Sequence, residues 1–455
     1  MTAIIDDQRV DALAATFSGE LLRSGQDGYE EARRVHNGLV NKSPALIARC
    51  TSPADVAAAI AFARSGGHEI SVRGGGHNVG GSAVTDGGVM VDLSGMKQIT
   101  VDPDARTLRA QGGVTWAELN DAAAEHGLAV TGGAISSTGI AGYTLGGGLG
   151  WLMSMYGLAA DNLLSVEIVT ADGEVLEASE TSNPDLFWAL RGGGGNFGVA
   201  TTFEYRVHPL AQIVGGLIAH PFAAAPDLLR FYRDAITDLP DELSVFAALV
   251  HAPDGSVAKL AALVVCHVGS PEQAEQDLAP FLAYGEPLLV QVGPMPYPEL
   301  NRMLDDGYPF GSLNYWKSAF TTGLDDGLLD AAIERFESVP SPMTALLFEH
   351  FHGEVTRIGV SETAVPHREP GFNLLITSVW TDPAETAENV AWTRESFDAL
   401  GPHLAARRWL NYLGSEDDVD AVRNAYGPNY NRLAEAKRRY DPDNVFRLNQ
   451  NIAPA

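Results

Sequence analysis

The sequence predicts an α+β protein with two domains, and three observations lead to this prediction. The chain has 455 residues, more than one simple core usually holds. Of its 48 glycines, 26 fall between Gly74 and Gly198, which implies several close approaches of the backbone to a ligand or to another element. After Pro209 glycine becomes sparse, and strands and helices follow without strict alternation, as in a domain with an antiparallel sheet and helices on one side.

Helices and strands alternate in the glycine-rich first part. Ser52 and Pro53 form an N-cap and first-turn pair before a helix over residues 55–64. Thr115 and Glu118 form a capping box that opens a second helix. The other elements predicted here are strands over residues 69–72, 88–93, 163–170 and 174–179, a hairpin over 99–110 and a short helix over 185–190.

The middle of the chain carries longer elements. Predicted strands cover residues 244–251, 258–268, 343–350 and 373–380, and predicted helices cover 224–239, 271–284, 324–338 and 383–400. In the tail the sequence becomes dense in motifs again. We therefore predict a first domain over residues 1–209, an inserted substrate-binding domain over 210–404, and a segment over 405–455 that returns to the first domain.

The composition is typical of a soluble enzyme and disfavours two classes of partner. With 30 basic and 58 acidic residues, the formal charge of -28 repels nucleic acids and anionic membranes. The first residues show no secretory signal and no transmembrane run occurs, so we expect a cytoplasmic protein. Cys50 and Cys266 stand near apolar runs and are interpreted as buried free thiols. No spacing typical of zinc ligands occurs, and no metal is predicted.

The run Arg73-Gly74-Gly75-Gly76-His77 follows a predicted strand and is the most informative feature of the chain. Glycines allow positive φ and leave backbone amides free to point at a ligand. This favours an anionic cofactor held by the backbone and contacted by His77. The alternative is a plain glycine-rich turn with a hydrogen-bonded histidine.

Two further glycine clusters cover residues 132–150 and 191–198. The first of them supplies small residues, hydroxyls and amides, as a nucleotide cradle requires. The cluster over residues 132–150 does not have the GxGxxG pattern that opens a Rossmann helix, and no P-loop sequence occurs in the chain. A glycine-rich packing corner is the alternative for a single cluster, and three clusters together make it the weaker interpretation.

The clusters belong to an ordered series of motifs: Arg73-Gly-Gly-Gly-His77, Gly139-x-x-Gly142-Tyr143-Thr144-Leu145 with Gly146 to Gly150, Tyr156-Gly157-Leu158-x-x-Asp161-Asn162, Arg191 to Gly198, Tyr426-Gly427-Pro428-Asn429-Tyr430, and Asp441 to Ile452. The series resembles the FAD-linked oxidases related to berberine bridge enzyme, a branch of the vanillyl-alcohol oxidase superfamily. The resemblance implies a two-domain fold with a PCMH-type FAD-binding domain, and a substrate domain built on an antiparallel sheet backed by helices.

The resemblance also implies how FAD is held. His77 matches the histidine that bonds to the 8α-methyl group of the flavin. Ile135 stands where many relatives have a cysteine that makes a second bond, so attachment through His77 only is predicted. The backbone amides of residues 74–78 and 80–82 would hold the pyrophosphate. The residues expected to bind FAD are Arg73, Gly74, Gly75, Gly76, His77, Asn78, Gly80, Gly81, Ser82, Thr138, Gly139, Gly142, Tyr143, Gly147, Asn162, Val199 and Asn449.

The catalytic residues are expected to be Tyr412 and Tyr143. The carboxylate that several relatives place on a substrate-facing strand aligns near Leu375, so no carboxylate base is predicted. Tyr412 would then be the base, and a cation would have to lower its pKa. Tyr143 stands where plant relatives have a histidine near the flavin. A buried core tyrosine is the alternative for Tyr412. The candidate cations are Arg368, Arg407 and Arg408.

The function that the resemblance implies is oxidation of a small alcohol, sugar or amine-containing natural product. Hydride would pass to flavin N5, and dioxygen would be reduced to hydrogen peroxide. One alternative is a dehydrogenase with another electron acceptor, and a second is a protective protein that binds or reoxidises a toxic natural product. Several aromatic residues of the middle domain are interpreted as core rather than pocket: Tyr308, Phe310, Tyr315, Trp316, Phe320, Phe348 and Phe351.

Overall fold

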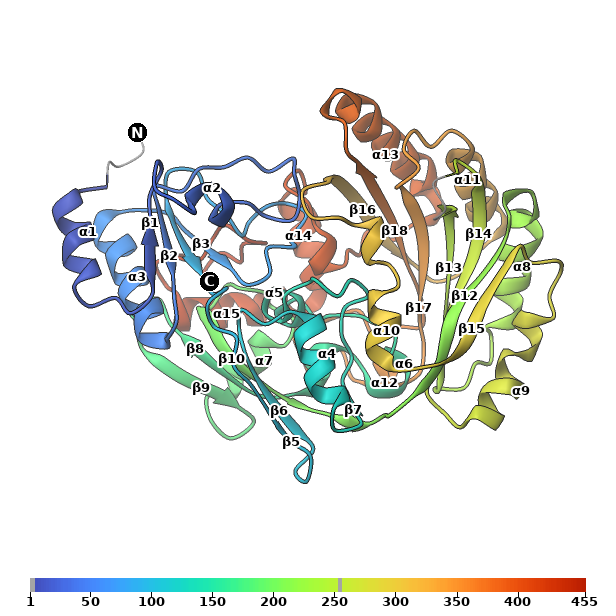
Figure 1. The fold of residues 1–455 in the computed structure, drawn as a ribbon, viewed down its shortest axis with the longest axis horizontal. Helices are drawn as coiled ribbons and strands as arrows, with labels where there is room; N and C mark the ends of the chain where they lie inside the picture. Colours follow the sequence, from blue (N-terminus) through green and yellow to red (C-terminus); the bar gives the residue numbers. More distant parts are fainter. Residues whose placement is uncertain (1–4, 253–255) are drawn as a thin grey trace.

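The computed structural model of the chain describes residues 5–252 and 256–455. Residues 1–4, on which the prediction of no secretory signal partly depends, lie outside this range. The first part of the chain and its C-terminal helices lie on the left in Figure 1, and a large sheet with its own helices lies on the right. None of the helices in the described ranges is long and apolar enough to cross a membrane. The predicted two-domain α+β fold is confirmed.

The first sheet has four strands in the order β1 (Glu20–Leu22), β2 (Leu46–Arg49), β4 (Val89–Asp92) and β3 (Ile70–Arg73). Strands β2, β3 and β4 are parallel. Helix α3 (Pro53–Gly66) connects β2 to β3, and the side chain of its N-cap Ser52 accepts a hydrogen bond from the amide of Asp55. Its apolar side chains pack on the sheet together with those of α1 (Asp7–Ala14). The helix α2 (Tyr29–Ala32) precedes β2.

The second sheet is antiparallel, with the order β5 (Ile99–Asp102), β6 (Thr107–Gln111), β10 (Val199–Arg206), β8 (Leu163–Val169) and β9 (Val175–Ser179). The predicted hairpin and the predicted pair of strands are confirmed, whereas β10 was not predicted. The predicted capping box opens α4 (Trp116–Ala124). The remaining short elements of this part are β7 (Leu128–Ala129), α5 (Ile140–Leu145), α6 (Met153–Tyr156), a 3-10 turn (Ala159–Asn162), α7 (Pro184–Leu190) and β11 (His208–Pro209).

The third sheet has seven antiparallel strands: β15 (Leu289–Met295), β12 (Ile213–Pro221), β14 (Lys259–His267), β13 (Leu243–His251), β17 (Ala345–Phe351), β18 (Gly371–Trp380) and β16 (Leu313–Thr321). All of them fall inside the range predicted for the inserted domain. Four of the seven were predicted. Two of the three missed strands carry weak strand signals, the Gly215-Gly216 pair in β12 and Pro294 in β15.

The central strands β13, β14, β17 and β18 are buried on both faces, whereas the edge strand β15 is partly exposed along its whole length. Helices α8 (Ala225–Ala235), α9 (Pro271–Leu282), α11 (Asp326–Glu337) and α13 (Thr386–Leu400) cover the outer face, on the right in Figure 1. Because side chains alternate along a strand, Leu346 and Phe348 pack among these helices, whereas Leu347 and Glu349 point to the other side. That other side faces the first part of the chain. Two short helices, α10 (Tyr297–Arg302) and α12 (Glu354–Arg357), lie there.

The C-terminal segment returns to the first part through α14 (Val419–Tyr426) and α15 (Tyr430–Tyr440), and α15 packs against α7. The ammonium group of Lys437 is fully buried with the carboxylate of Asp441, 2.6 Å away. Lys437 also donates to the carbonyl oxygens of Asn196 and Phe446, both at 2.8 Å. This pair therefore ties the third glycine cluster to the tail. It fixes the backbone just ahead of residues 447–450.

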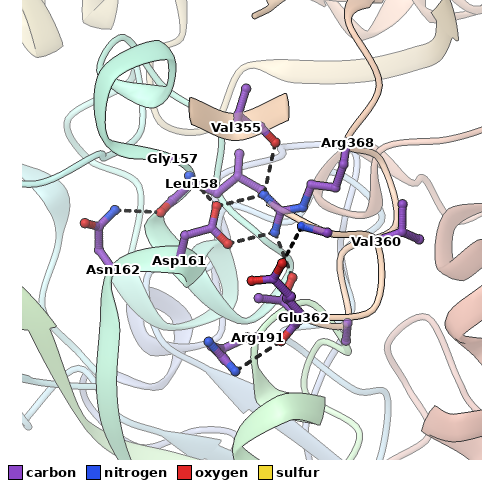
Figure 2. A network of polar contacts seen from close by, with 12 residues as sticks. Gly157, Leu158, Asp161, Asn162, Arg191, Val355, Val360, Glu362 and Arg368 are labelled. Atoms are coloured by element: carbon purple, nitrogen blue, oxygen red, sulfur yellow. Dashed lines mark hydrogen bonds and ion pairs between the residues drawn. The ribbon is translucent and has the colours of Figure 1, made fainter. Parts of the chain in front are cut away.

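A buried ion pair joins the first part to the loop before β18. Arg368 donates to both oxygens of Asp161 at 2.8 and 2.7 Å, and the two side chains are only 2% and 4% exposed. Figure 2 shows this network, in which the amide of Leu158 also donates to Asp161 and Arg368 reaches the carbonyl of Val355. The network therefore holds the motif around Asp161, in the first part of the chain, against the loop before β18 in the inserted domain.

Arg368→Met is expected to lower the free energy of unfolding by about 3–5 kcal/mol, because it leaves the carboxylate of Asp161 buried without its cation. The measurement is the midpoint of urea unfolding. Arg357→Met is the matched control, since Arg357 pairs with Asp241 at the surface, and a much smaller loss than that of Arg368→Met is expected there. Equal losses in both variants would contradict a special contribution of the buried pair.

Candidate active site

A large cavity lies between the glycine-rich part and the seven-stranded sheet. The first two glycine clusters, the end of the third and the tail line one half of it, and β16, β17 and β18 with residues 304–308 and 409–412 line the other. We call these the cofactor half and the substrate half. The structure brings most of the predicted site residues to this cavity: Gly74, Gly75, Gly76, His77, Asn78, Ser82, Thr138, Gly139, Gly142, Tyr143, Val199, Asn449 and Tyr412.

The glycine loop after β3 has the properties expected of an anion cradle. Gly76 has φ 71°, a conformation that favours glycine. A Cβ on Gly75 would lie 2.3 Å from the amide nitrogen of Gly139, so the first two clusters can approach each other only as glycines. Within the described chain, the amides of residues 74–78 donate no hydrogen bond to another protein group. Consecutive free amides of this kind bind phosphate oxygens.

The imidazole of His77 is enclosed in the cofactor half. Its Nε2 lies 2.9 Å from the Ser137 hydroxyl, and its Nδ1 lies 3.3 Å from the Thr138 hydroxyl. Its ring stacks on that of His36, with centroids 4.0 Å apart. Burial lowers the pKa of His77 well below the usual value, and the neighbouring His36 lowers it further. His77 is therefore a neutral imidazole at neutral pH, with one unprotonated ring nitrogen.

The residues present fit a bound FAD. Ser71 Oγ and Asn449 Oδ1, both in the cofactor half, are buried and have no hydrogen-bond partner in the described protein. The buried Tyr143 hydroxyl also has no partner there. A Cβ on Gly142 would meet no atom within 4 Å, so this glycine borders open space in the cavity. Unpaired polar atoms and free amides around such a space match the polar edges and phosphates of a dinucleotide.

Five predicted cofactor residues do not line the cavity. They are Arg73, Gly80, Gly81, Gly147 and Asn162, and they stand near lining residues in the sequence or in the fold without reaching the cavity themselves. Arg73 pairs with the buried Asp92 at 2.6 Å and braces the start of the glycine loop. The Asn162 side chain donates to the carbonyls of Tyr156 and Leu158, so it closes its own turn.

The prediction for the amides of residues 80–82 needs a correction. The amide of Gly81 donates to the carbonyl of Asn78 at 3.0 Å, and the amide of Ser82 donates to the Asn78 side chain at 3.4 Å. These two donors are used inside the loop. Gly80 does not line the cavity, so the free amides available for a pyrophosphate are those of residues 74–78.

Leu375 lines the cavity, at the position where no carboxylate was predicted, but the neighbouring strand supplies a carboxylate that the sequence analysis did not predict. Glu349 on β17 lies in the substrate half and is 5% exposed. It pairs in register with Asn373 on β18, two residues before the predicted position Leu375. The side chain of Asn373 donates to Glu349 Oε2 at 2.6 Å. Burial raises the pKa of Glu349 to about 7.

Tyr412 was expected to have a lowered pKa, and the structure contradicts this. Its hydroxyl donates to Glu349 Oε1 at 2.8 Å, and burial together with the Glu349 charge raises its pKa well above the usual value. The three candidate cations are engaged elsewhere: Arg368 with Asp161, Arg407 with Glu369, and Arg408 with backbone carbonyls. The phenol alone is therefore not ionised near neutral pH.

Aromatic side chains surround the Glu349–Tyr412 pair. The ring of Trp316 meets those of Tyr308 and Tyr412 edge to face, with centroids 5.9 and 6.0 Å apart. The Tyr308 hydroxyl lies 2.8 Å from the hydroxyl of Thr377. Tyr308 and Trp316 thus line the cavity, contrary to their interpretation as core. The interpretation as core holds for Phe320, Phe348 and Phe351, which are buried in apolar clusters, whereas Phe310 is 57% exposed.

Two site residues were missed in the sequence. Glu349 is the one charged residue in β17, whose pattern is otherwise apolar or histidine, and a charge inside such a strand is itself a signal of function. His36 stands in a segment with no motif that we recognised, and only the tertiary structure brings it to His77.

These features define the chain as an FAD-linked oxidoreductase of the berberine bridge enzyme-like family, with a PCMH-type FAD-binding fold. The family models "FAD binding domain" and "Berberine and berberine like" match residues 44–179 and 400–453.

Comparison with individual proteins supports this assignment. The chain is 32% identical to (R)-6-hydroxynicotine oxidase of Paenarthrobacter nicotinovorans, over 97% of this chain and 98% of the relative. It is 28% identical to an FAD-linked oxidoreductase of Dictyostelium discoideum, over 98% and 97% of the two chains. The crystal structure of 6-hydroxy-D-nicotine oxidase from Arthrobacter nicotinovorans superposes with a TM-score of 0.88 at 31% identity, covering 97% of this chain and 99% of that one. BBE-like 1 of Physcomitrella patens shares the fold, with a TM-score of 0.89, 23% identity and coverage of 98% and 99%.

Proposed function

We propose that the protein oxidises a small, mostly apolar organic substrate at a carbon that bears a hydroxyl or amine group, with dioxygen as electron acceptor. The observation that carries this proposal is the hydrogen bond from Tyr412 to the buried carboxylate of Glu349, in the same cavity as the glycine loop. The name of the relative from P. nicotinovorans, an oxidase, supports dioxygen as acceptor.

The Glu349–Tyr412 pair can take up the proton that the substrate loses. Both oxygens of Glu349 accept a hydrogen bond, an arrangement that suits the ionised carboxylate. A substrate group that donates to the Tyr412 oxygen can pass its proton to the phenol while the phenol passes its own proton to Glu349. Tyr412 then never has to persist as a phenolate. When bound, FAD supplies the hydride acceptor and passes the electrons onward.

The lining of the substrate half indicates the class of substrate. Leucine, tryptophan and tyrosine side chains surround the single carboxylate. Within the described lining from Leu304 to Tyr412, no lysine or arginine occurs, so the carboxylate of an acidic substrate would have no cationic partner. A substrate with an apolar or aromatic body and one hydroxyl or amine group fits this surface.

We also propose that His77 is the only covalent link to FAD. His77 is half-buried in the cofactor half, and its pKa is lowered well below the usual value, so the imidazole is neutral at neutral pH. Ile135 lines the same cavity, and its alkyl side chain cannot bond to the flavin.

Activity is expected to depend on pH through Glu349. Its pKa of about 7 means that the carboxylate is protonated below this pH and ionised above it. Only the ionised form can accept a proton, so kcat/KM should rise as the pH increases through about 7. Initial rates between pH 5 and 9 test this expectation. A rate that falls over the same interval would contradict the role of Glu349 as base.

A substrate screen tests the oxidase proposal as a whole. The purified protein is mixed with aryl-substituted alcohols, amines and sugars, and hydrogen peroxide is measured. In parallel, stopped-flow absorbance follows reoxidation of the reduced protein by air. Peroxide formed with an apolar alcohol or amine supports the proposal. Turnover with an artificial acceptor but slow reoxidation by air would indicate a dehydrogenase. Binding without turnover would indicate a protective role, which the presence of Glu349 makes the weaker alternative.

A further inference from the structure

His36 lies directly against the histidine that we propose to hold FAD. It stands between α2 and β2, and it is 3% exposed. Its ring and that of His77 are 4.0 Å apart between centroids, with 26° between their planes. A buried ring stacked at this distance restricts the rotation of its neighbour, because any large turn of His77 would collide with it.

His36 is itself held from both sides of the cavity. Its amide donates to the carbonyl of Gly76 at 3.0 Å, and its carbonyl accepts from the amide of Gly311 at 2.9 Å. Its ring Nε2 lies 2.9 Å from the carbonyl oxygen of Tyr308. Because a carbonyl oxygen only accepts, Nε2 carries a proton and donates it. These three hydrogen bonds hold both the backbone and the ring of His36 in place between the glycine loop and residues 308–311.

The surroundings of His77 therefore restrain it on one face and at two edges. His36 covers the face, and the hydroxyls of Ser137 and Thr138 lie against the two ring nitrogens. The hydroxyls can rotate to donate or accept, so they suit either tautomer. The stacked ring is the contact that sets the plane of the imidazole.

We propose that His36 is a positioning residue for the covalent attachment of the flavin to His77. This inference rests on the proposed covalent link. Forming the link replaces one C–H bond of the flavin methyl group and the N–H bond of the imidazole by a C–N bond. The two protons and two electrons that leave are taken up by dioxygen, which becomes hydrogen peroxide. His36 exchanges no proton in this scheme, and it holds the His77 ring in one plane so that the attacking nitrogen keeps its direction.

The test compares the loss of the stacked ring with its conservative replacement. Full-length wild type, His36→Phe and His36→Leu are produced in riboflavin-starved cells and mixed with FAD, and the covalent fraction is followed by intact mass. Both variants lose the hydrogen bond to Tyr308, but only His36→Leu also loses the flat ring. We expect His36→Phe to attach FAD within about threefold of the wild-type rate and His36→Leu to be slower by about tenfold or more. Total bound FAD is expected to be similar in all three.

His208→Leu serves as the matched control, because it removes a histidine that stacks on Tyr156 at 4.0 Å, outside the cavity lining. Its attachment rate is expected to equal that of wild type. A wild-type rate in His36→Leu, or a tenfold loss in His36→Phe, would overturn the positioning role. If His36→Leu fails to bind FAD, the attachment rate is measured in His36→Gln instead, because glutamine also lacks the flat ring. A wild type that never gains the mass of FAD would instead overturn the covalent link itself.

Discussion

Glu349→Gln is expected to lower kcat/KM about 10²–10⁴-fold, the range that a positioned general base contributes. Glutamine has nearly the same shape and can still accept a hydrogen bond from Tyr412, but it cannot take up a proton near neutral pH. The rate of flavin reduction by substrate under anaerobic conditions is the direct measurement. It isolates the step in which the substrate loses its proton from reoxidation by air.

The control for Glu349→Gln is Glu369→Gln, the same change of residue type at the protein surface. Glu369 pairs with Arg407 and has a side chain that is 67% exposed, so Glu369→Gln should reduce the flavin at the wild-type rate. A loss smaller than about tenfold in Glu349→Gln would place the base elsewhere.

Tyr412 and Glu349 should behave as one unit. Tyr412→Phe removes the group that we expect to contact the substrate, and its loss should be similar to that of Glu349→Gln. Because groups that act together are not additive, the double variant should be no slower than the slower single variant. Losses that multiply in the double variant would show that the two side chains act independently.

His77→Ala is expected to release all of the flavin when the protein is denatured in acid. In wild type the yellow colour should stay with the precipitated polypeptide, because a covalent bond survives unfolding. The free amides of residues 74–78 remain in the variant, so the folded protein should still bind FAD reversibly. Its flavin should also be a weaker oxidant, since the imidazole substituent on the methyl group is lost. Absorbance of pellet and supernatant, and a dye-linked redox titration, provide the two measurements.

His126→Ala is the control, because His126 is exposed and does not line the cavity. It should retain the flavin in the pellet. Colour that stays in the pellet of His77→Ala would show that another residue forms the bond.

Local sequence signals predicted much of the fold because each depends on a few neighbouring residues. The capping box of Thr115 and Glu118 and the cap at Ser52 both occur as predicted. The buried free thiols Cys50 and Cys266 are also confirmed. Strand β12 was missed because Gly215 and Gly216 lower its strand propensity, and pairing on both sides with β14 and β15 compensates for this.

The site was predicted where it consists of continuous motifs and missed where it depends on tertiary contacts. The glycine loop and His77 were found because phosphate binding needs a run of consecutive amides. Glu349 was missed because it lies on β17, whereas the carboxylate was expected on the neighbouring strand β18, at the position of Leu375. Tyr412 was found, but its pKa depends on Glu349, which lies 63 residues away in the chain. No local pattern indicates such a partner.

Peptide mass mapping of the wild-type protein tests the central claim most directly, namely that His77 alone carries the flavin in this cavity. Trypsin should produce a peptide over residues 74–97, which contains His77, and another over residues 110–191, which contains Ile135. We predict that the mass of FAD is found on the first peptide and on no other. An unmodified peptide over residues 74–97, or flavin on any other peptide, would contradict the account.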